Sequence, residues 1–183
     1  MAESYGFFDS GINDTRQYTA NTFAEYFRSF FTTGVSSGLQ ISATSGMNVS
    51  LAQGFAIIQG YFYKNDGAFA IAIENSDPNL PRIDRIVLKL DLIARTIHAV
   101  VKKGNTSSSP FAPSLQRDSN IYEISLAKIY VSAGATTISA SNITDERYDL
   151  SVCGLASAIV KPVIILNAVQ PNLTQGDIWI QYI

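Results

Sequence analysis

The stretch that decides the fold is RIDRIVLKLDLIARTIHAVVKKG, which runs from residue 82 to residue 104. Alternate positions in its first part are apolar: Ile86, Leu88, Leu90 and Leu92. Most positions between them carry charges, so the period is two residues, which is typical of a half-buried β-strand. After a short break, residues 96–102 alternate in the same way. The two runs therefore predict a β-hairpin.

Further short runs of strand-forming residues lie on both sides of this hairpin. We expect strands at Leu39–Ala43, Met47–Leu51, Phe55–Gln59, Tyr61–Lys64, Phe69–Ile73, Tyr122–Val131 and Thr136–Ala140. Asp66-Gly67 is the strongest tight-turn signal among the breaks between them. In the run 122–131, one face is expected to carry Tyr122, Ile124, Leu126 and Tyr130. Evenly spaced short strands predict a mainly β protein, an antiparallel sandwich or barrel.

One short helix is expected before the first strand. Thr22 and Glu25 match the capping box that begins many helices, and Gly34 suits the position after a helix end. Aromatic side chains recur with helical spacing at Phe23, Tyr26, Phe27, Phe30 and Phe31. A helix of about three turns is too short to be stable alone in water. Its aromatic face must therefore be buried, either in the core of its own chain or against a neighbouring subunit.

Extended segments are expected at both ends. The sequence divides into an N-terminal arm with the amphipathic helix (1–36), a β domain (37–153) and a C-terminal arm or short β element (154–183). The Ser- and Pro-rich stretch Gly104–Asn120 is expected to cross over the β domain, and a binding role for it stays open. Trp179 and Tyr182 make the C-terminus apolar, and burying such area contributes roughly 25 cal/mol per Å².

Composition limits the classes of partner. Only 15% of the 183 residues are charged and 46% are hydrophobic, which fits burial against copies of the same chain or an ordinary β domain with a polar surface. The net charge is −2 and no basic run exceeds Lys102–Lys103, so we expect no nucleic-acid binding. The N-terminus lacks the pattern of a signal peptide. The most apolar stretch, 154–169, is broken by Lys161 and Pro162, so we expect no membrane span.

The sequence offers little chemistry for catalysis. His98 is the only histidine and Cys153 the only cysteine, and we expect a strand residue and a small buried residue respectively. Asp145, Glu146 and Asp149 surround Arg147, which indicates a salt-bridged turn more than a cation site or a pair of catalytic carboxylates. We therefore expect no enzyme activity, no cofactor and no required metal. Aromatic residues that could stack on sugar rings are Tyr61, Tyr63 and Trp179.

Four stretches together carry a resemblance to a known family. They are YGFFDS with TFAEYFRSFFTTGV near the start, GFAIIQGYFYKND, RIDRIVLKLDLIARTI, and the segment from VVKKGNTSSSPFAPSLQRD through ITDERYDLSVCG. This set resembles tail-tip, baseplate or receptor-binding (fibre N-terminal) structural proteins of phages and prophages of Gram-positive hosts. The resemblance implies a β-rich, oligomeric, non-enzymatic virion part that is assembled in the bacterial cytoplasm, and it carries no catalytic residues over to this chain.

Two hypotheses about function follow. In the first, the chain is a structural component of a phage tail tip or baseplate that links the tail to host-recognition parts, and its partners are other tail or baseplate proteins and copies of itself, as a trimer by the symmetry of such assemblies. The residues expected to pack in that assembly are Phe23, Phe27, Phe30, Phe31, Trp179 and Tyr182. In the second, the chain is a module that binds a host cell-wall saccharide. A connector should bury its aromatic residues between chains, whereas a saccharide-binding module should show a groove with exposed aromatic residues.

Overall fold

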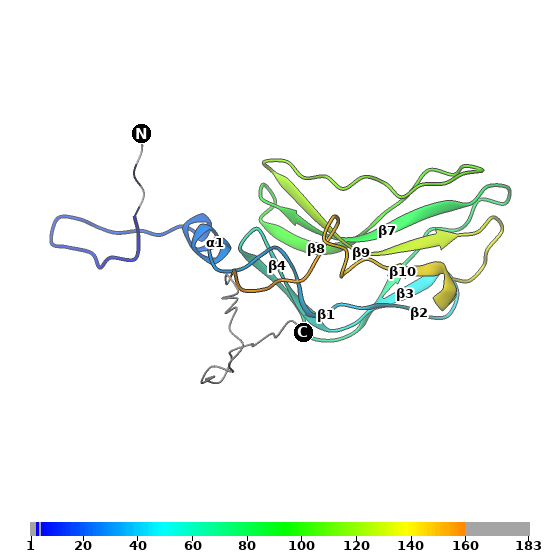
Figure 1. Ribbon diagram of the computed structural model, residues 1–183, viewed down its shortest axis with the longest axis horizontal. Coiled ribbons are helices and arrows are strands. Elements are labelled where there is room, and N and C mark those ends of the chain that lie inside the picture. The colour runs from blue at the N-terminus through cyan, green and yellow to red at the C-terminus, as the bar shows by residue number, and fades with distance from the viewer. Residues whose placement is uncertain (1–2, 4, 160–183) are drawn as a thin grey trace, which may run out of the picture.

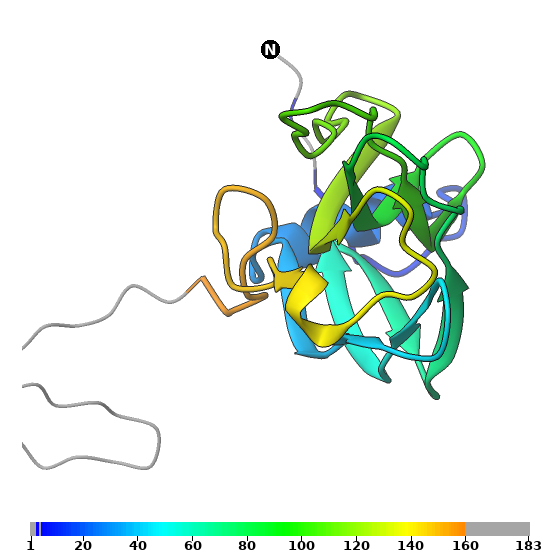
Figure 2. The same ribbon diagram turned by 90° about the vertical axis from the view of Figure 1, so that its right-hand side faces the viewer.

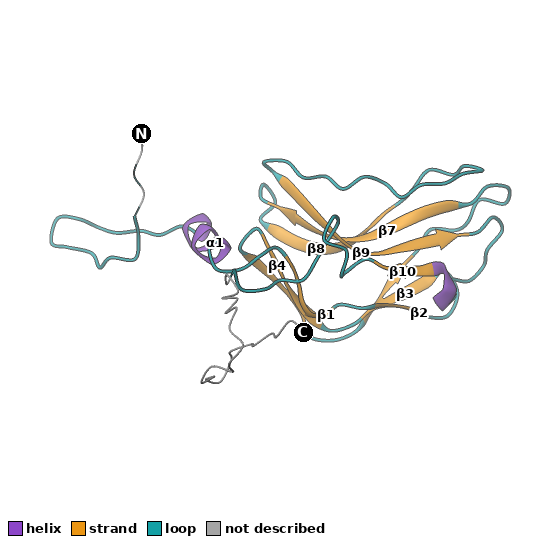
Figure 3. Ribbon diagram, viewed as in Figure 1, coloured by secondary structure: helices purple, strands orange, loops and turns teal. Residues whose placement is uncertain are grey.

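The computed structural model describes residues 3 and 5–159. As predicted, the protein is mainly β with antiparallel sheets and one short N-terminal helix (Figures 1 and 3). The elements follow the order α1 (Ala20–Arg28), β1 (Gly34–Gly38), β2 (Ile41–Ala43), β3 (Asn48–Leu51), β4 (Gly54–Ile58), β5 (Tyr61–Asn65), β6 (Phe69–Ala72), β7 (Arg82–Asp91), β8 (Thr96–Lys102), β9 (Ile121–Val131), a 3₁₀ turn (Ala140–Asn142) and β10 (Ile143–Asp145). The β strands form two layers, which Figure 2 shows end on.

The first layer is a four-stranded antiparallel sheet in the order β10-β9-β7-β8. The predicted hairpin is confirmed, because β7 pairs with β8 from Asp91 opposite Thr96 to Arg85 opposite Lys102. Ile86, Leu88 and Leu90 are buried on the inner face, as the alternation predicts. Leu92, which was expected on the same face, is exposed in the turn that follows β7.

A β-bulge in β9 changes which residues face the core. The pairing with β7 shifts by one residue between Ile86, opposite Ala127, and Val87, opposite Ser125. Because one extra residue reverses the alternation, the side chains beyond the bulge change faces. Tyr130 is therefore exposed, and its predicted place on one face with Tyr122 and Ile124 is wrong.

The second layer consists of three long strands that bend in the middle. One half is the sheet β1-β4-β5 and the other is the sheet β2-β3-β6. The chain passes from one half to the other between β1 and β2, between β3 and β4, and between β5 and β6. Hydrogen bonds continue through the bend, since Leu39 N–H donates to Gln53 O and Ala52 N–H donates to Gln40 O. Glycine is required there: a Cβ on Gly38 would lie 2.0 Å from Gln53 O.

Because of this bend, the predicted tight turn at Asp66-Gly67 does not join two paired strands. Asp66-Gly67 joins β5 to β6, but these strands belong to different sheets and do not pair. The tight turn of this region is instead Gln59-Gly60, which connects the paired strands β4 and β5. Both residues have positive φ, 51° and 81°, which is the conformation that two-residue hairpin loops favour.

The hydrophobic core lies between the two layers. Val35, Ala56 and Ile58 enter it from the sheet β1-β4-β5, and Val49 and Leu51 enter it from the sheet β2-β3-β6. The inner face of the four-stranded sheet completes the core with β7 and β9 side chains. This arrangement agrees with the predicted sandwich.

The outer face of the four-stranded sheet is polar and covered. The loop 104–120 runs along it at the top of Figure 1, as expected for a crossover. Arg85, which is buried, binds Glu146 (Nε–Oε2, 3.1 Å) and donates to the carbonyl of Pro113 in this loop (2.7 Å). Glu123 accepts from Lys102 (2.5 Å) and from the backbone of Gln116 (2.7 Å). Buried charges that are paired in this way fix the loop on the sheet.

Two other local predictions are corrected. The helix begins two residues before the predicted cap, because Thr19 accepts a hydrogen bond from Thr22 N–H (3.3 Å) and is the N-cap. It ends at Arg28, and Gly34 begins β1 instead of ending the helix. Residues 136–140 form no strand, whereas the polar stretch after them supplies β10.

Candidate assembly surface

The helix α1 stands at one end of the sandwich (Figure 1). Ala24 is its only buried residue. The backbone of Ala24 lies against Gly60 in the β4–β5 turn, where an added Cβ would be 1.9 Å from the Ala24 carbonyl oxygen. Arg28 adds a hydrogen bond from Nη2 to the Gln59 carbonyl (3.0 Å). The turn at Gly60, which separates the two predicted strands Phe55–Gln59 and Tyr61–Lys64, therefore supports the helix.

The phenylalanines of α1 and of the residues just after it remain partly exposed in the described part of the chain. Phe23, Phe27 and Phe30 are 44–47% exposed and Phe31 is 36% exposed. The alternative in which these side chains belong to the intrachain core is therefore wrong for the described residues. Burial against a second molecule is the alternative that stays open.

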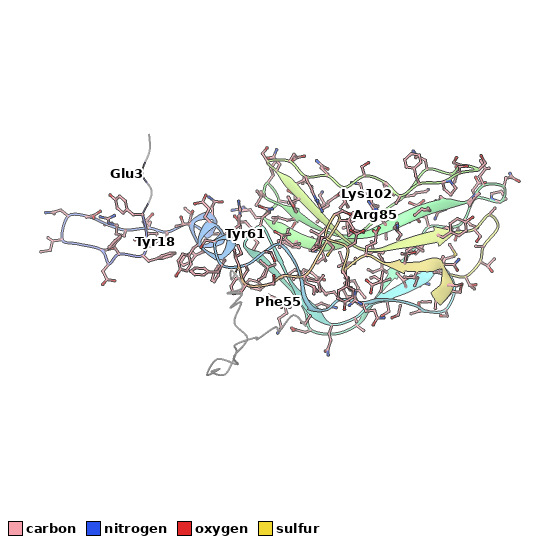
Figure 4. All side chains as sticks on the ribbon, in the orientation of Figure 1. Glu3, Tyr18, Phe55, Tyr61, Arg85 and Lys102 are labelled. Atoms are coloured by element: carbon pink, nitrogen blue, oxygen red, sulfur yellow. The ribbon has the colours of Figure 1, made fainter. Side chains whose placement is uncertain are left out.

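The N-terminal arm folds back on α1 and enlarges this aromatic face. The ring of Phe7 lies 5.4 Å from those of Tyr18 and Phe23 and 4.8 Å from that of Tyr26 (centroid distances). The Tyr18 hydroxyl closes the arm, because it accepts from Phe8 N–H (2.7 Å) and donates to Phe8 O (3.1 Å). Figure 4 shows Tyr18 in the arm, beyond α1 and away from the β strands. The arm is thus ordered by contacts with the helix rather than with the β domain.

We define the aromatic surface as the exposed aromatic residues of the arm, of α1 and of the three residues that follow α1. They are Tyr5, Phe7, Phe8, Phe23, Tyr26, Phe27, Phe30 and Phe31, and each is between 36% and 69% exposed. With about 200 Å² for a fully exposed aromatic side chain, these residues present on the order of 800 Å² to solvent. A single soluble chain rarely exposes a patch larger than about 300–600 Å², whereas a standard interface buries about 800 Å² per partner. The aromatic surface therefore has the size of an interface.

An ion pair lies beside this surface. Arg16 binds Asp14 (2.5 Å) and lies 5.6 Å from the Tyr5 ring centroid. The hydrogen bond to Asp14 raises the pKa of Arg16. Ile12 is fully exposed in the tight turn that is closed by the pairing of Gly11 with Asp14. The arm therefore places an apolar tip and one ion pair beside the aromatic rings.

The C-terminal end of the described chain returns to the same place. Thr32 N–H donates to Ser157 O (2.9 Å) and Ile159 N–H donates to Phe30 O (2.7 Å). The two predicted interface residues beyond this point, Trp179 and Tyr182, lie outside the described residues. Residues 154–159 therefore bring the chain to the end of α1.

The predicted sugar-stacking residues lie elsewhere. Tyr61 and Tyr63 are half-buried and pack against the core from β5, and burial raises the pKa of Tyr63. Trp179 lies outside the described residues. The aromatic residue that this strand exposes is Phe62, which alternates with the two tyrosines. The period of two in Tyr61–Asn65 was the available signal, but sequence alone does not tell which face is inward.

The remaining candidates lie in a strand, in the core and in a turn of the β domain. His98 is an exposed residue of β8 opposite Lys89. Cys153 is buried in the core as predicted, and desolvation raises its pKa to about 12. The acidic turn is salt-bridged as predicted, with Arg147 bound to Asp145 (2.6 Å) and Glu146 turned toward Arg85.

Within residues 3 and 5–159, no three His, Cys, Asp or Glu side chains gather in a way that could hold a metal ion. None of the helices in this same part of the chain has the length and apolar character needed to cross a membrane. In comparisons with known proteins, no family model, no curated protein and no solved structure matched the chain.

Proposed function

We propose that this protein is a structural component of a phage tail tip or baseplate that assembles with itself and links the tail to host-recognition parts. The observation that carries the proposal is the aromatic surface, which projects from the sandwich on the arm and α1 and has the area of an interface. The sequence resemblance to phage tail structural proteins supplies the setting. The copies form a trimer, because such tail parts follow the symmetry of the particle.

The arrangement of charges supports a structural role over a catalytic one. The buried charged groups make ion pairs or hydrogen bonds within the chain: Arg82 with Asp84 (2.9 Å), Arg85 with Glu146 (3.1 Å), and Lys102 with Glu123 (2.5 Å). Catalytic carboxylates need an environment that leaves one of them ready to exchange a proton. Here each buried carboxylate neutralises a cation that holds a loop or a strand in place.

The oligomeric state tests the first half of the proposal. Light scattering coupled to gel filtration should give three times the mass of the 19.9 kDa chain at micromolar concentration. A monomer over the whole accessible concentration range would contradict self-assembly. A closed oligomer of another size would contradict the trimer. It would not contradict self-assembly through the aromatic surface.

The setting is tested in the particle. Immunogold labelling of intact phage with antibody against this chain should place label at the distal tail. Label absent from particles, with the protein recovered free from uninduced cells, would overturn the assignment to the tail.

A further inference from the structure

A second exposed aromatic feature lies on the β4–β5 hairpin, on the face turned away from the core. Phe55 on β4 and Phe62 on β5 stack with centroids 5.7 Å apart and ring planes only 6° from parallel. Phe62 is 69% exposed, whereas Phe55 is half-buried beneath it. The pairing explains the stack, because Phe62 faces Ile57 across the hairpin and Phe55 is the diagonal neighbour.

Phe55 also forms one wall of a groove at the bend of the second layer. The groove has a volume of about 540 Å³, which is within the range of small-molecule sites. Its lining includes Gln40, Gln53, Phe55, Lys64, Asp66 and Arg147. The exposed ring of Phe62, which does not itself line the groove, adjoins it through the stacked ring of Phe55, and the lining combines apolar surface with several polar side chains. Figure 4 shows Phe55 on the side of the molecule opposite Arg85 and Lys102.

The walls of the groove are rigid. A Cβ on Gly54 would lie 2.3 Å from Ser37 O, so the two strand backbones cross in close contact there. Arg147 donates from Nη1 to Gly38 O (2.6 Å) and from Nη2 to Asp145 (2.6 Å), which fixes its guanidinium at the groove. A site built on paired strands is preorganised and loses little entropy when a ligand binds.

The polar groups of the groove favour an uncharged ligand. Lys64 is neutralised by Asp66 (2.6 Å) and Arg147 by Asp145, so the lining offers no net positive charge for a phosphate or a nucleic acid. Gln40 and Gln53 are exposed, and neither side chain donates or accepts a hydrogen bond within the described residues. Each amide provides two donors and one acceptor oxygen. These groups suit hydroxyl or acetamido substituents.

We infer that this groove binds an uncharged oligosaccharide, with the C–H face of one sugar ring on Phe62 and the hydroxyl groups of the next units on the amides of Gln40 and Gln53. A sugar combines an apolar ring face with many hydroxyl groups, which matches an exposed aromatic ring beside polar amides. A second protein copy fits less well as the ligand. The area of one exposed ring with half-buried neighbours is far smaller than the area that each partner buries in a standard interface, which is about 800 Å². This binding function goes beyond self-assembly, which the proposal above assigns to α1 and the arm.

The probes are neutral and N-acetylated tetrasaccharides and hexasaccharides on an array, followed by calorimetry of the full chain with the strongest binder. We expect Phe62→Ala to weaken binding at least about tenfold and Gln53→Ala to weaken it several-fold, since loss of about 1.4 kcal/mol is tenfold in affinity. The matched control is Phe69→Ala, which removes an exposed phenylalanine from β6 in the other half of the layer. That variant should bind like the wild type, and all three should keep the wild-type melting temperature.

Several results would overturn the inference. These are no binding to any neutral or N-acetylated saccharide, equal losses in Phe62→Ala and Phe69→Ala, or preference for dextran sulfate over neutral sugars. Conversion of the oligomer to a monomer by Phe62→Ala would also overturn it, because the ring would then be an interface between copies. Saccharide binding by a monomeric protein would support this site and contradict only the proposed self-assembly.

Discussion

The carbonyl of Ala24 in α1 lies directly against Gly60 in the β4–β5 turn, with no room between them for a side chain. Gly60 also has φ +81°, a conformation that strains any residue with a Cβ. We expect Gly60→Ala to displace α1 and to destabilise the protein by about 1–3 kcal/mol from backbone strain alone. Thermal unfolding measures the change.

The matched control for Gly60→Ala is Gly67→Ala, because a Cβ on Gly67 would meet nothing within 4 Å. Its melting temperature should stay within about 2 °C of the wild type. Equal melting temperatures of the two variants would show that the contact between α1 and the β4–β5 turn is not required for stability.

Phe27→Ala should act on association more than on folding. The Phe27 side chain is 44% exposed in the single chain. Its removal should therefore lower the free energy of unfolding of the monomer by much less than the cost of removing a fully buried phenylalanine, which is about 3–5 kcal/mol. If the aromatic surface is an interface, the same change should weaken association at least about tenfold. Sedimentation velocity over a concentration series measures this, with Phe111→Ala in the loop 104–120 as an equally apolar exposed control. A loss of stability with unchanged association would contradict the role of α1 in assembly.

Glu146→Gln should release the loop 104–120. Glu146 is buried and pairs with both Arg85 (3.1 Å) and Lys128 (3.2 Å), so the change leaves a buried guanidinium without its carboxylate. Breaking one partner of a buried pair costs roughly 3–5 kcal/mol. We expect a lower urea midpoint and faster proteolysis within the loop.

The control for Glu146→Gln is Asp66→Asn, which breaks the exposed pair with Lys64. Exposed pairs contribute at most about 1 kcal/mol, so this variant should unfold like the wild type. Equal destabilisation by the two changes would mean that the buried pair does not hold the loop.

The protein should lose stability in acid. A hydrogen bond from Arg147 lowers the pKa of Asp145, one from Gln116 lowers the pKa of Asp118, and the Ala94 N–H lowers the pKa of Asp91, each below the ordinary value of 3.8. A carboxyl whose folded pKa is lowered stabilises the fold above its unfolded pKa, and this contribution disappears as pH falls through the folded value. The urea midpoint should therefore be nearly constant above about pH 5 and fall below about pH 4. A midpoint that rises below pH 4 would contradict this sign.

Cys153 should be unreactive in the folded protein. Its side chain is buried and burial raises its pKa to about 12, so almost no thiolate forms at pH 8. A thiol reagent such as dithionitrobenzoate should react slowly with the native protein and at once with the protein in concentrated urea. Rapid reaction under native conditions would show that the core around Cys153 opens.

Local pattern was a good guide wherever one face of an element is buried and the other is not. The alternation of Ile86, Leu88 and Leu90 predicted β7 and its inner face, and the alternation in Tyr122–Val131 predicted β9. The pattern failed at the bulge near Ala127, because an extra residue is stabilised by pairing with β7 and leaves no mark in composition. The same limit applies to Asp66-Gly67, since a glycine-containing pair suits a bend as well as a turn.

For the candidate sites, the sequence by itself determined that Phe23, Tyr26 and Phe27 share one side of a short helix, because helical spacing follows from covalent geometry. Phe30 and Phe31, which were predicted on the same side, lie beyond the helix end at Arg28. It also determined that Phe62 lies opposite Tyr61 and Tyr63 on a strand, because side chains alternate. Only the tertiary structure decided which of these faces is buried. Burial depends on which distant segments pack on an element: the core takes the tyrosines of β5, whereas the phenylalanines of α1 stay 44–45% exposed in the described chain.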